Sequence, residues 1–191
     1  MFNKKTKIQD TSLDDFMSYG CDLKNRIIYV EGDVDDVSVS QAMKALQLLD
    51  LEDSTKPIKL IINSFGGSVY DGLALYDAIR NAKSEVYTYG YGKIMSMAVS
   101  ILIAGDKRFI SKSSTVMVHE ISDFVVGQLQ ELKRAVKEAE RLESLMLDFF
   151  VERTSNKDRK YWESLKNDTY FTAEEAVKLG IADEIITVES E

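Results

Sequence analysis

Short runs of apolar and β-branched residues alternate along this chain with longer segments in which apolar residues recur every three or four positions. Runs of the first kind are typical of strands, and spacing of the second kind is typical of helices. The predicted strands cover residues 26–30, 58–62, 85–91, 107–110, 115–118 and 184–188. The predicted helices cover residues 39–49, 69–79, 96–104 and about 128–152. Alternation of the two kinds of element predicts an α/β fold.

One further short helix is marked by its two end signals. Thr172 and Glu175 form a capping box, in which each side chain accepts a hydrogen bond from the other residue's backbone N–H. Gly180 suits the end of such a helix, because glycine readily adopts the left-handed backbone of a C-terminal cap. We therefore expect a helix between Thr172 and Gly180.

The beginning of the chain lacks either periodicity. Residues 1–20 are polar and without pattern, which predicts a flexible N-terminal arm. Residues 21–191 show no internal repeat, low-complexity tract or linker. Because a chain of 191 residues most simply makes one domain, we expect this part to form a single domain.

Composition narrows the classes of partner. The chain is 45% hydrophobic and 29% charged, which is ordinary for a globular protein. Its formal net charge of −8 argues against a surface that binds nucleic acid, since such a surface needs clustered Lys and Arg. The longest apolar run, residues 97–104, is too short to span a bilayer. We expect neither a nucleic acid nor a membrane as a partner.

Cys21 is the only cysteine, so the chain can form no intrachain disulfide and no cysteine cluster that holds zinc. The first residues include lysines but no apolar stretch of the kind found in a secretory signal. Both features fit a reducing environment, and we expect a cytoplasmic protein.

Two turns that contain glycine each follow a predicted strand and open a predicted helix, at residues 63–68 and 90–96. Such turns point backbone N–H groups outward at the positive end of a helix dipole. The glycines either satisfy the tight turns alone or build an anion or oxyanion site. The first turn has neither a GxGxxG pattern nor a P-loop lysine, so nucleotide binding is poorly supported.

Ser96 begins the apolar helix of the second turn, either as a helix cap or as a nucleophile. A serine hydroxyl is a weak nucleophile unless a base takes its proton. His119, at the end of a predicted strand, is the only histidine, so any Ser–His mechanism requires it. A third group must orient the imidazole, and spacing alone does not select it among 32 acidic residues.

Four segments, in chain order, resemble motifs of the ClpP family of self-compartmentalising serine proteases. They read INSFGGSV at residues 62–69, GKIMSMA at 92–98, VMVHE at 116–120 and NDTYFTAEEA at 167–176. The first three are similar to the family's I-N-S-P-G-G-x-V, G-x-A-A-S-M-G and V-M-I-H-Q, and the fourth is similar to the segment that carries the triad aspartate. The resemblance extends from about residue 23 to 186, and the chain is identified as a divergent member of the family.

This resemblance implies a fold and an activity. The fold would be the ClpP/crotonase-like α/β fold of repeated β-β-α units, with a protruding handle helix at about 128–152. The activity would be that of a serine endopeptidase, with Ser96 as nucleophile, His119 as general base and Asp168 as the orienting carboxylate. The backbone N–H groups of Gly67 and Met97 would form the oxyanion hole. No metal or organic cofactor is implied.

The resemblance also implies substrates and partners. An extended polypeptide would pair with the backbone at Gly66, Ser68 and Val69 and with a strand after Val125. Heptameric rings, stacked through the handle helix into a tetradecamer, would enclose the sites so that only unfolded chains reach them. An AAA+ unfoldase of the ClpX or ClpA type would supply those chains. Residues 59–61, on the strand before the first turn, contain none of the aromatic residues that help the family dock this partner.

Several residues depart from the family motifs near the site. Phe65 replaces a proline, and Ile94 and Met95 replace two alanines, which is expected to add bulk beside Ser96. Smaller differences are Ala98 for glycine, Asn167 for arginine and residues 122–124 for a glycine-rich stretch.

Three alternatives to the ring-forming protease are considered. A phage-type head-maturation protease on the same fold shares the chemistry and differs in substrate. A catalytically weak or non-catalytic ring subunit would keep the fold with a crippled site, which the bulk of Ile94 and Met95 favours and the complete set of Ser96, His119 and Asp168 disfavours. A crotonase-like acyl-CoA enzyme would use glycine turns for an oxyanion hole but has no need of the full triad.

Overall fold

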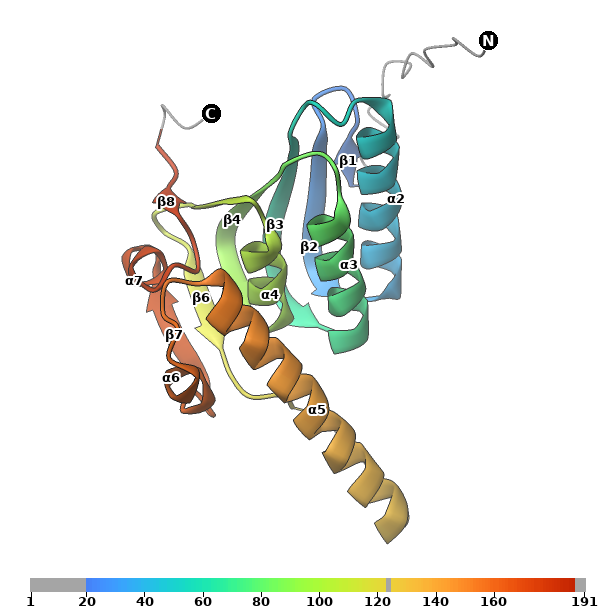
Figure 1. The fold of residues 1–191 in the computed structure, drawn as a ribbon, viewed down its shortest axis with the longest axis vertical. Helices are drawn as coiled ribbons and strands as arrows, with labels where there is room; N and C mark the ends of the chain where they lie inside the picture. The colour runs from blue at the N-terminus through green and yellow to red at the C-terminus, as the bar shows by residue number, and fades with distance from the viewer. Residues whose placement is uncertain (1–19, 123–124, 188–191) are drawn as a thin grey trace.

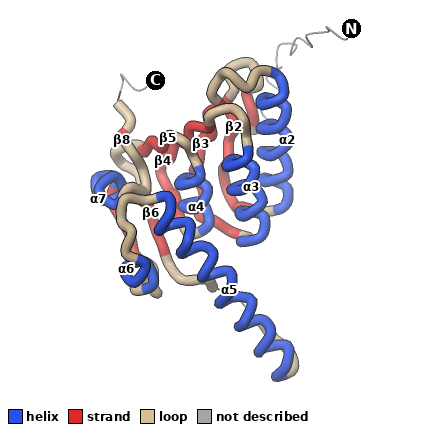
Figure 2. Tube along the Cα trace, in the orientation of Figure 1, coloured by secondary structure: helices blue, strands red, loops and turns tan. Residues whose placement is uncertain are grey.

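The computed structural model of the chain describes residues 20–122 and 125–187. The predicted N-terminal arm, residues 1–20, lies outside the described residues apart from Gly20. The described part of the chain forms one mixed sheet with helices against it (Figures 1 and 2). The α/β class expected from the alternating pattern is confirmed.

The sheet has eight strands in the described residues, in the order β1-β2-β3-β4-β5-β8, with β6 paired to β4 and β7 paired to β6. The strands are β1 (Cys21–Asp22), β2 (Ile27–Val34), β3 (Ile58–Gly67), β4 (Val86–Met95), β5 (Lys107–Ile110), β6 (Thr115–Val118), β7 (Thr169–Thr172) and β8 (Glu184–Ile185). The β1–β2 and β6–β7 pairs are antiparallel and the other pairs are parallel. Parallel pairing of successive strands requires the crossover helices that the sequence pattern predicts.

The described helices are α2 (Asp36–Glu52), α3 (Val69–Asn81), α4 (Met97–Ala104), α5 (Leu129–Arg153), α6 (Arg159–Glu163) and α7 (Ala173–Leu179). Helices α2, α3 and α4 lie side by side over one face of the sheet, and α6 and α7 lie beside β6 and β7 (Figure 1). The capping box of α7 and the left-handed Gly180 at its end are both present as predicted. Of the described helices, none combines the length and the apolar character that crossing a bilayer demands.

Two strands continue beyond the ends predicted for them, into the glycine turns. β3 continues to Gly67, which pairs with Val34 of β2, and β4 continues to Met95, which pairs with Met117 of β6. Hydrogen bonds to the neighbouring strands hold these segments extended, and this pairing cannot be read from local composition. The short elements β1, α6 and β7 were not predicted, because each is too brief to show a period.

Helix α4 forms the centre of the core, since all of its residues are buried. Its last carbonyl groups are therefore shielded from water and need donors from the protein. Arg153 donates from Nε to Ile103 O at 3.1 Å and from Nη2 to Gly105 O at 2.8 Å. Arg80 donates from Nη1 to Ala104 O at 3.0 Å. These two arginines satisfy the buried end of the helix that Ser96 begins.

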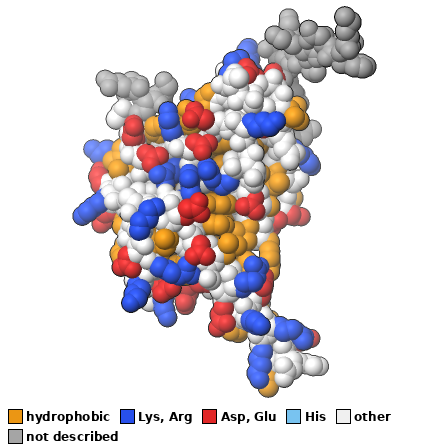
Figure 3. Space-filling view, in the orientation of Figure 1, with side chains coloured by type: hydrophobic (Ala, Val, Ile, Leu, Met, Phe, Trp, Pro, Cys, Tyr) orange, Lys and Arg blue, Asp and Glu red, His pale blue; other side chains and the backbone are white. Residues whose placement is uncertain are grey.

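Helix α5 projects from the body of the protein (Figure 1). Its buried residues are Leu142, Leu147 and Phe150, all in the half that packs against the body. In the projecting half, Leu129 is 65% exposed and Val136 is 58% exposed. On the face shown in Figure 3, acidic and basic side chains are interspersed, and apolar side chains gather near the middle.

A close contact between α3 and α4 is expected to determine stability. A methyl group added to Gly72 would lie 2.2 Å from Cγ of Met97, whose side chain is fully buried. Although alanine favours a helix over glycine by about 1 kcal/mol, we expect Gly72→Ala to lower the free energy of unfolding by about 1–3 kcal/mol through overpacking. Urea denaturation followed by circular dichroism measures the change.

Ala74 provides the matched control for Gly72, because it is exposed on the same helix. Ala74→Gly is expected to cost about 1 kcal/mol through helix propensity alone. A Gly72→Ala variant that is more stable than the wild type would show that the contact with Met97 does not limit packing.

Candidate active site

Ser96 lies in a sharp turn between β4 and α4. Its backbone angles are φ 52° and ψ −125°, a combination that non-glycine residues rarely adopt. The Ser96 N–H donates to Met117 O at 2.8 Å, and the Val99 N–H donates to Ser96 O at 2.9 Å. A strained turn from strand to helix presents the side chain of its central residue at the end of the sheet, as in nucleophile elbows.

The Ser96 hydroxyl contacts His119. Ser96 Oγ lies 2.8 Å from Nε2 of the imidazole, and the hydroxyl makes no capping hydrogen bond to α4. In the tautomer that carries its proton on Nδ1, the imidazole accepts this hydrogen bond from the hydroxyl. Although Ser96 precedes the first residue of α4, its hydroxyl is therefore engaged with the only histidine and not with the helix.

Asp168 directly precedes β7, and His119 directly follows β6. The antiparallel register pairs Val118 with Thr169, and its continuation by one residue sets Asp168 opposite His119. Within the described residues, no hydrogen bond or ion pair joins the two side chains. The carboxylate of Asp168 is exposed and accepts a hydrogen bond from the Tyr170 hydroxyl at 3.4 Å. Of the three residues expected to form a triad, the structure thus joins Ser96 and His119 and leaves Asp168 as a backbone neighbour.

The end of β3 passes directly against the Ser96 turn. A methyl group on Gly66 would lie 2.6 Å from Met95 O and 2.9 Å from both Met97 N and Ser96 Cβ. The backbone of Gly66 also has a positive φ of 93°. Gly67 has a φ of 151°, and a methyl group there would lie 2.3 Å from Val34 O. Gly66 therefore needs to be glycine for β3 to approach the Ser96 turn, and Gly67 needs to be glycine for β3 to approach Val34 of β2.

The candidates for the oxyanion hole lie in these two turns. Met97 is the first residue of α4, so its N–H has no partner within the helix and points along the dipole. Its side chain is buried in the core, which leaves the backbone as the part of Met97 that can act on a bound group. Gly67 is exposed at the end of β3.

The residues expected to contact the substrate differ in whether their backbone N–H groups already have a partner in the fold. The Ser68 N–H donates to Val34 O at 2.7 Å, and its hydroxyl caps α3 by accepting from Asp71 N at 3.4 Å. Val69 begins α3, so its N–H has no partner within the helix. Ser68 is therefore engaged in the fold, whereas Val69 keeps a free position for a hydrogen bond.

The strand expected after Val125 does not form. Val125 is 40% exposed, and the described residues between it and α5 have no regular structure. The capping box of Gln128 and Glu131 begins α5 at once, and a lone segment without a paired neighbour has nothing to keep it extended. Residues 123–124 lie outside the described residues.

The bulk of Ile94 does not narrow the site. The Ile94 side chain is fully buried, and a methyl group on Gly90 would lie 2.9 Å from its Cδ1. Ile94 therefore fills core space on the inner face of β4. Met95 is half-buried.

His119 also lines a cavity that the sequence did not predict. Glu143 of α5 shares it, and the remaining lining residues are Val118, Met146, Leu147, Phe150, Trp162 and Leu165. These side chains come from β6, α5, α6 and the segment after α6. Met146 belongs to the predicted apolar stripe of the long helix, but nothing in the sequence indicates that this stripe would meet Trp162 beside the histidine.

Comparisons with known proteins show what this chain is similar to. The family model described as Clp protease matches residues 10–189. A curated protein from Deinococcus radiodurans, named ATP-dependent Clp protease proteolytic subunit, is 34% identical over 166 residues. That alignment covers 86% of this chain and 81% of the relative.

The contact between Gly66 and the Ser96 turn yields a test of the site. Gly66→Ala is expected to displace the turn and to lower the rate at which a fluorophosphonate probe labels Ser96 by about 100-fold, the typical cost of a 1 Å misplacement. Mass spectrometry of the labelled peptide measures that rate. Gly32→Ala is the control, because Gly32 also has a positive φ, 76°, but has no heavy atom within 4 Å of an added methyl group. Equal labelling of the two variants would show that the approach of Gly66 does not set the position of Ser96.

Proposed function

The chain belongs to the Clp protease family, and on this premise we propose that it is a serine endopeptidase with Ser96 as nucleophile and His119 as general base. The observation that carries the proposal is the distance of 2.8 Å between Ser96 Oγ and His119 Nε2 at a strained strand-to-helix turn. Neither packing in the core nor capping of α4 requires a serine with a positive φ and a hydrogen bond to the single histidine.

The proposed reaction proceeds through an acyl-enzyme. As Ser96 Oγ attacks the carbonyl carbon of the peptide bond, His119 Nε2 takes the hydroxyl proton. The imidazolium then gives this proton to the amine of the leaving fragment as the C–N bond breaks. A water molecule, deprotonated by the same imidazole, hydrolyses the ester and restores Ser96.

Negative charge that develops on the carbonyl oxygen needs donors close to Ser96. We assign this role to the backbone N–H groups of Met97 and Gly67. The free N–H at the start of α4 and the close approach of β3 to the Ser96 turn support the assignment. Loss of one such donor typically costs about 3–4 kcal/mol of transition-state stabilisation.

Asp168 is proposed as the carboxylate that accepts from Nδ1 of His119 and supports its positive charge. The β6–β7 register supports this role, since its continuation sets the two residues opposite each other. A rotation of the Asp168 side chain away from the Tyr170 hydroxyl would be needed for the two groups to meet, because no hydrogen bond joins them among the described residues.

The projecting half of α5 supports a proposal about assembly. Its exposed Leu129 and Val136 need a partner, and a second ring of the same chain would cover them. On the body side, the Tyr70 hydroxyl donates to Glu138 Oε1 at 2.8 Å and Arg141 donates to both oxygens of the same carboxylate. The hydrogen bonds from Arg141 and Tyr70 lower the pKa of Glu138 to about 2, so the carboxylate that accepts the hydrogen bond from α3 stays ionised at neutral pH.

We propose that heptameric rings stack through α5 into a tetradecamer that encloses the active sites. Confinement would restrict a nonspecific peptidase to unfolded chains in the cytoplasm. An AAA+ unfoldase of the ClpX or ClpA type would deliver them. The printed name of the Deinococcus radiodurans relative describes that protein as the proteolytic subunit of an ATP-dependent protease. The site favours an active peptidase over a non-catalytic ring subunit. The Ile94 side chain is buried in the core, and Ser96 is hydrogen-bonded to His119. A head-maturation protease would share this chemistry and would differ in its substrate.

The chemistry is tested by labelling and by hydrolysis of short unstructured peptides. Ser96→Ala is expected to abolish fluorophosphonate labelling, because it removes the attacking oxygen. Asp168→Asn is expected to lower kcat on the order of 1,000- to 10,000-fold by favouring the wrong tautomer of His119. Circular dichroism and native mass spectrometry confirm that each variant keeps its fold and assembly.

A wild-type assembly that is neither labelled at Ser96 nor active on peptides would overturn the protease proposal. Unchanged activity in Asp168→Asn would remove Asp168 from the mechanism and leave Ser96 and His119 in their roles.

Assembly is tested at Val136. Val136→Glu places a charge in the proposed contact between rings, so native mass spectrometry is expected to show single rings where the wild type shows double rings. Arg134→Glu is the control, because Arg134 is an exposed residue on the other side of the same helix. If Val136→Glu retains the mass of the wild-type assembly, α5 is not the contact between rings.

A further inference from the structure

The segment that begins at His119 leaves the sheet and makes few hydrogen bonds to the rest of the described chain. β6 ends at Val118, and residues 119–122 belong to neither a helix nor a strand. Within the described part of the chain, this segment makes two hydrogen bonds to the rest of the protein. One is the bond between His119 and Ser96, and in the other the Ile121 N–H donates to Glu143 Oε2 at 2.8 Å.

Glu143 lies on a part of α5 that is well packed and accepts the hydrogen bond from this segment. It lies on the half of α5 that packs against the body, between the buried side chains of Leu142 and Leu147, and is itself half-buried. Glu143 also lines the cavity beside the imidazole of His119. Its carboxylate therefore reaches the backbone two residues beyond the histidine from a helix that is fixed in the core.

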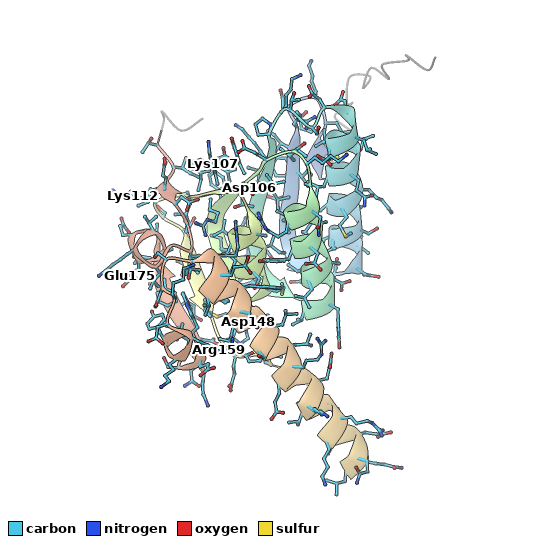
Figure 4. All side chains as sticks on the ribbon, viewed as in Figure 1. Asp106, Lys107, Lys112, Asp148, Arg159 and Glu175 are labelled. Atoms are coloured by element: carbon cyan, nitrogen blue, oxygen red, sulfur yellow. The ribbon has the colours of Figure 1, made fainter. Side chains whose placement is uncertain are left out.

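The helix that carries Glu143 is tied to its neighbour by Arg159. Its guanidinium pairs with Asp148 and donates to Ser144 Oγ at 2.9 Å on α5, and it pairs with Glu163 on α6 at 3.0 Å. Figure 4 shows Asp148 and Arg159 at the junction of the two helices. These contacts fix α5 against α6, which forms another wall of the cavity.

We propose that Glu143 is a positioning residue for His119, a role that rests on the proposed function. By accepting the hydrogen bond from Ile121, Glu143 holds the segment after β6 so that Nε2 of the imidazole stays within reach of Ser96 Oγ. Glu143 does not touch the reacting atoms. Without this bond, the only hydrogen bond left between the described segment from His119 to Ser122 and the rest of the described chain would be the one between His119 and Ser96.

Two conservative substitutions separate the hydrogen bond from the charge. Glu143→Gln keeps an acceptor oxygen at the same reach and removes the charge. Glu143→Asp keeps the charge and shortens the side chain, so the carboxylate no longer reaches the Ile121 N–H. We expect Glu143→Gln to hydrolyse peptides at nearly the wild-type rate. Glu143→Asp is expected to lower kcat between about 10- and 100-fold with little change in KM, because a misplaced base slows the chemical step and not binding.

The same two substitutions at Glu140 provide the matched controls, since Glu140 is an exposed residue on the same helix. Native mass spectrometry and thermal unfolding show whether each variant keeps its assembly and stability. Fluorophosphonate labelling of the wild type, made first, tests the protease function separately. If the wild type is labelled at Ser96, the variants then report on Glu143 alone.

The proposal is supported if Glu143→Gln retains kcat and Glu143→Asp loses it. Loss in Glu143→Gln with retention in Glu143→Asp would overturn it, because the charge and not the hydrogen bond would then matter. Equal activity of both variants and the wild type would also overturn it. A loss in Glu143→Asp that raises KM with an unchanged kcat would assign Glu143 to substrate binding and likewise overturn the positioning role.

Discussion

The backbone of Ser96 departs from both strand and helix geometry, and the contacts that hold it there organise the surrounding structure. A positive φ at a serine costs free energy, so it persists only where neighbouring groups leave the chain no alternative. Here the carbonyl of Met117 fixes the Ser96 N–H, and the first turn of α4 fixes its carbonyl. Gly66 packs directly against the Ser96 turn, where there is no room for a side chain at residue 66. The strain turns the hydroxyl away from the helix and toward the imidazole.

β4 has different partners at its two ends. Its first half pairs with β5, and its last residues pair with β6. Because β6 runs parallel to β4 and ends at Val118, the next residue, His119, emerges at the same edge as Ser96. The antiparallel partner β7 then brings Asp168 to that edge from the opposite direction. Strand pairing thus brings together three segments that are far apart in the sequence.

Helix α5 joins this site to the outside of the molecule. Its inner half supplies Arg153 to the buried end of α4, Glu143 to the segment after His119 and Met146 to the cavity beside the imidazole. Its outer half projects with apolar side chains exposed. The proposed assembly and the proposed positioning of His119 therefore share one element.

The sequence by itself determined the long elements and the one histidine that a Ser–His mechanism could use. Periodic apolar residues predicted α2, α3 and α5, and with a single histidine in the chain any Ser–His mechanism had to use His119. Only the tertiary structure decided how far β3 and β4 extend, that Ile94 faces the core and that Glu143 meets Ile121. These features depend on pairing and packing between distant segments, which local composition does not encode. Asp168 lies between the two cases. The resemblance proposed it as the orienting carboxylate, and the β6–β7 pairing ends one residue short of Asp168 and His119, but no hydrogen bond joins their side chains among the described residues.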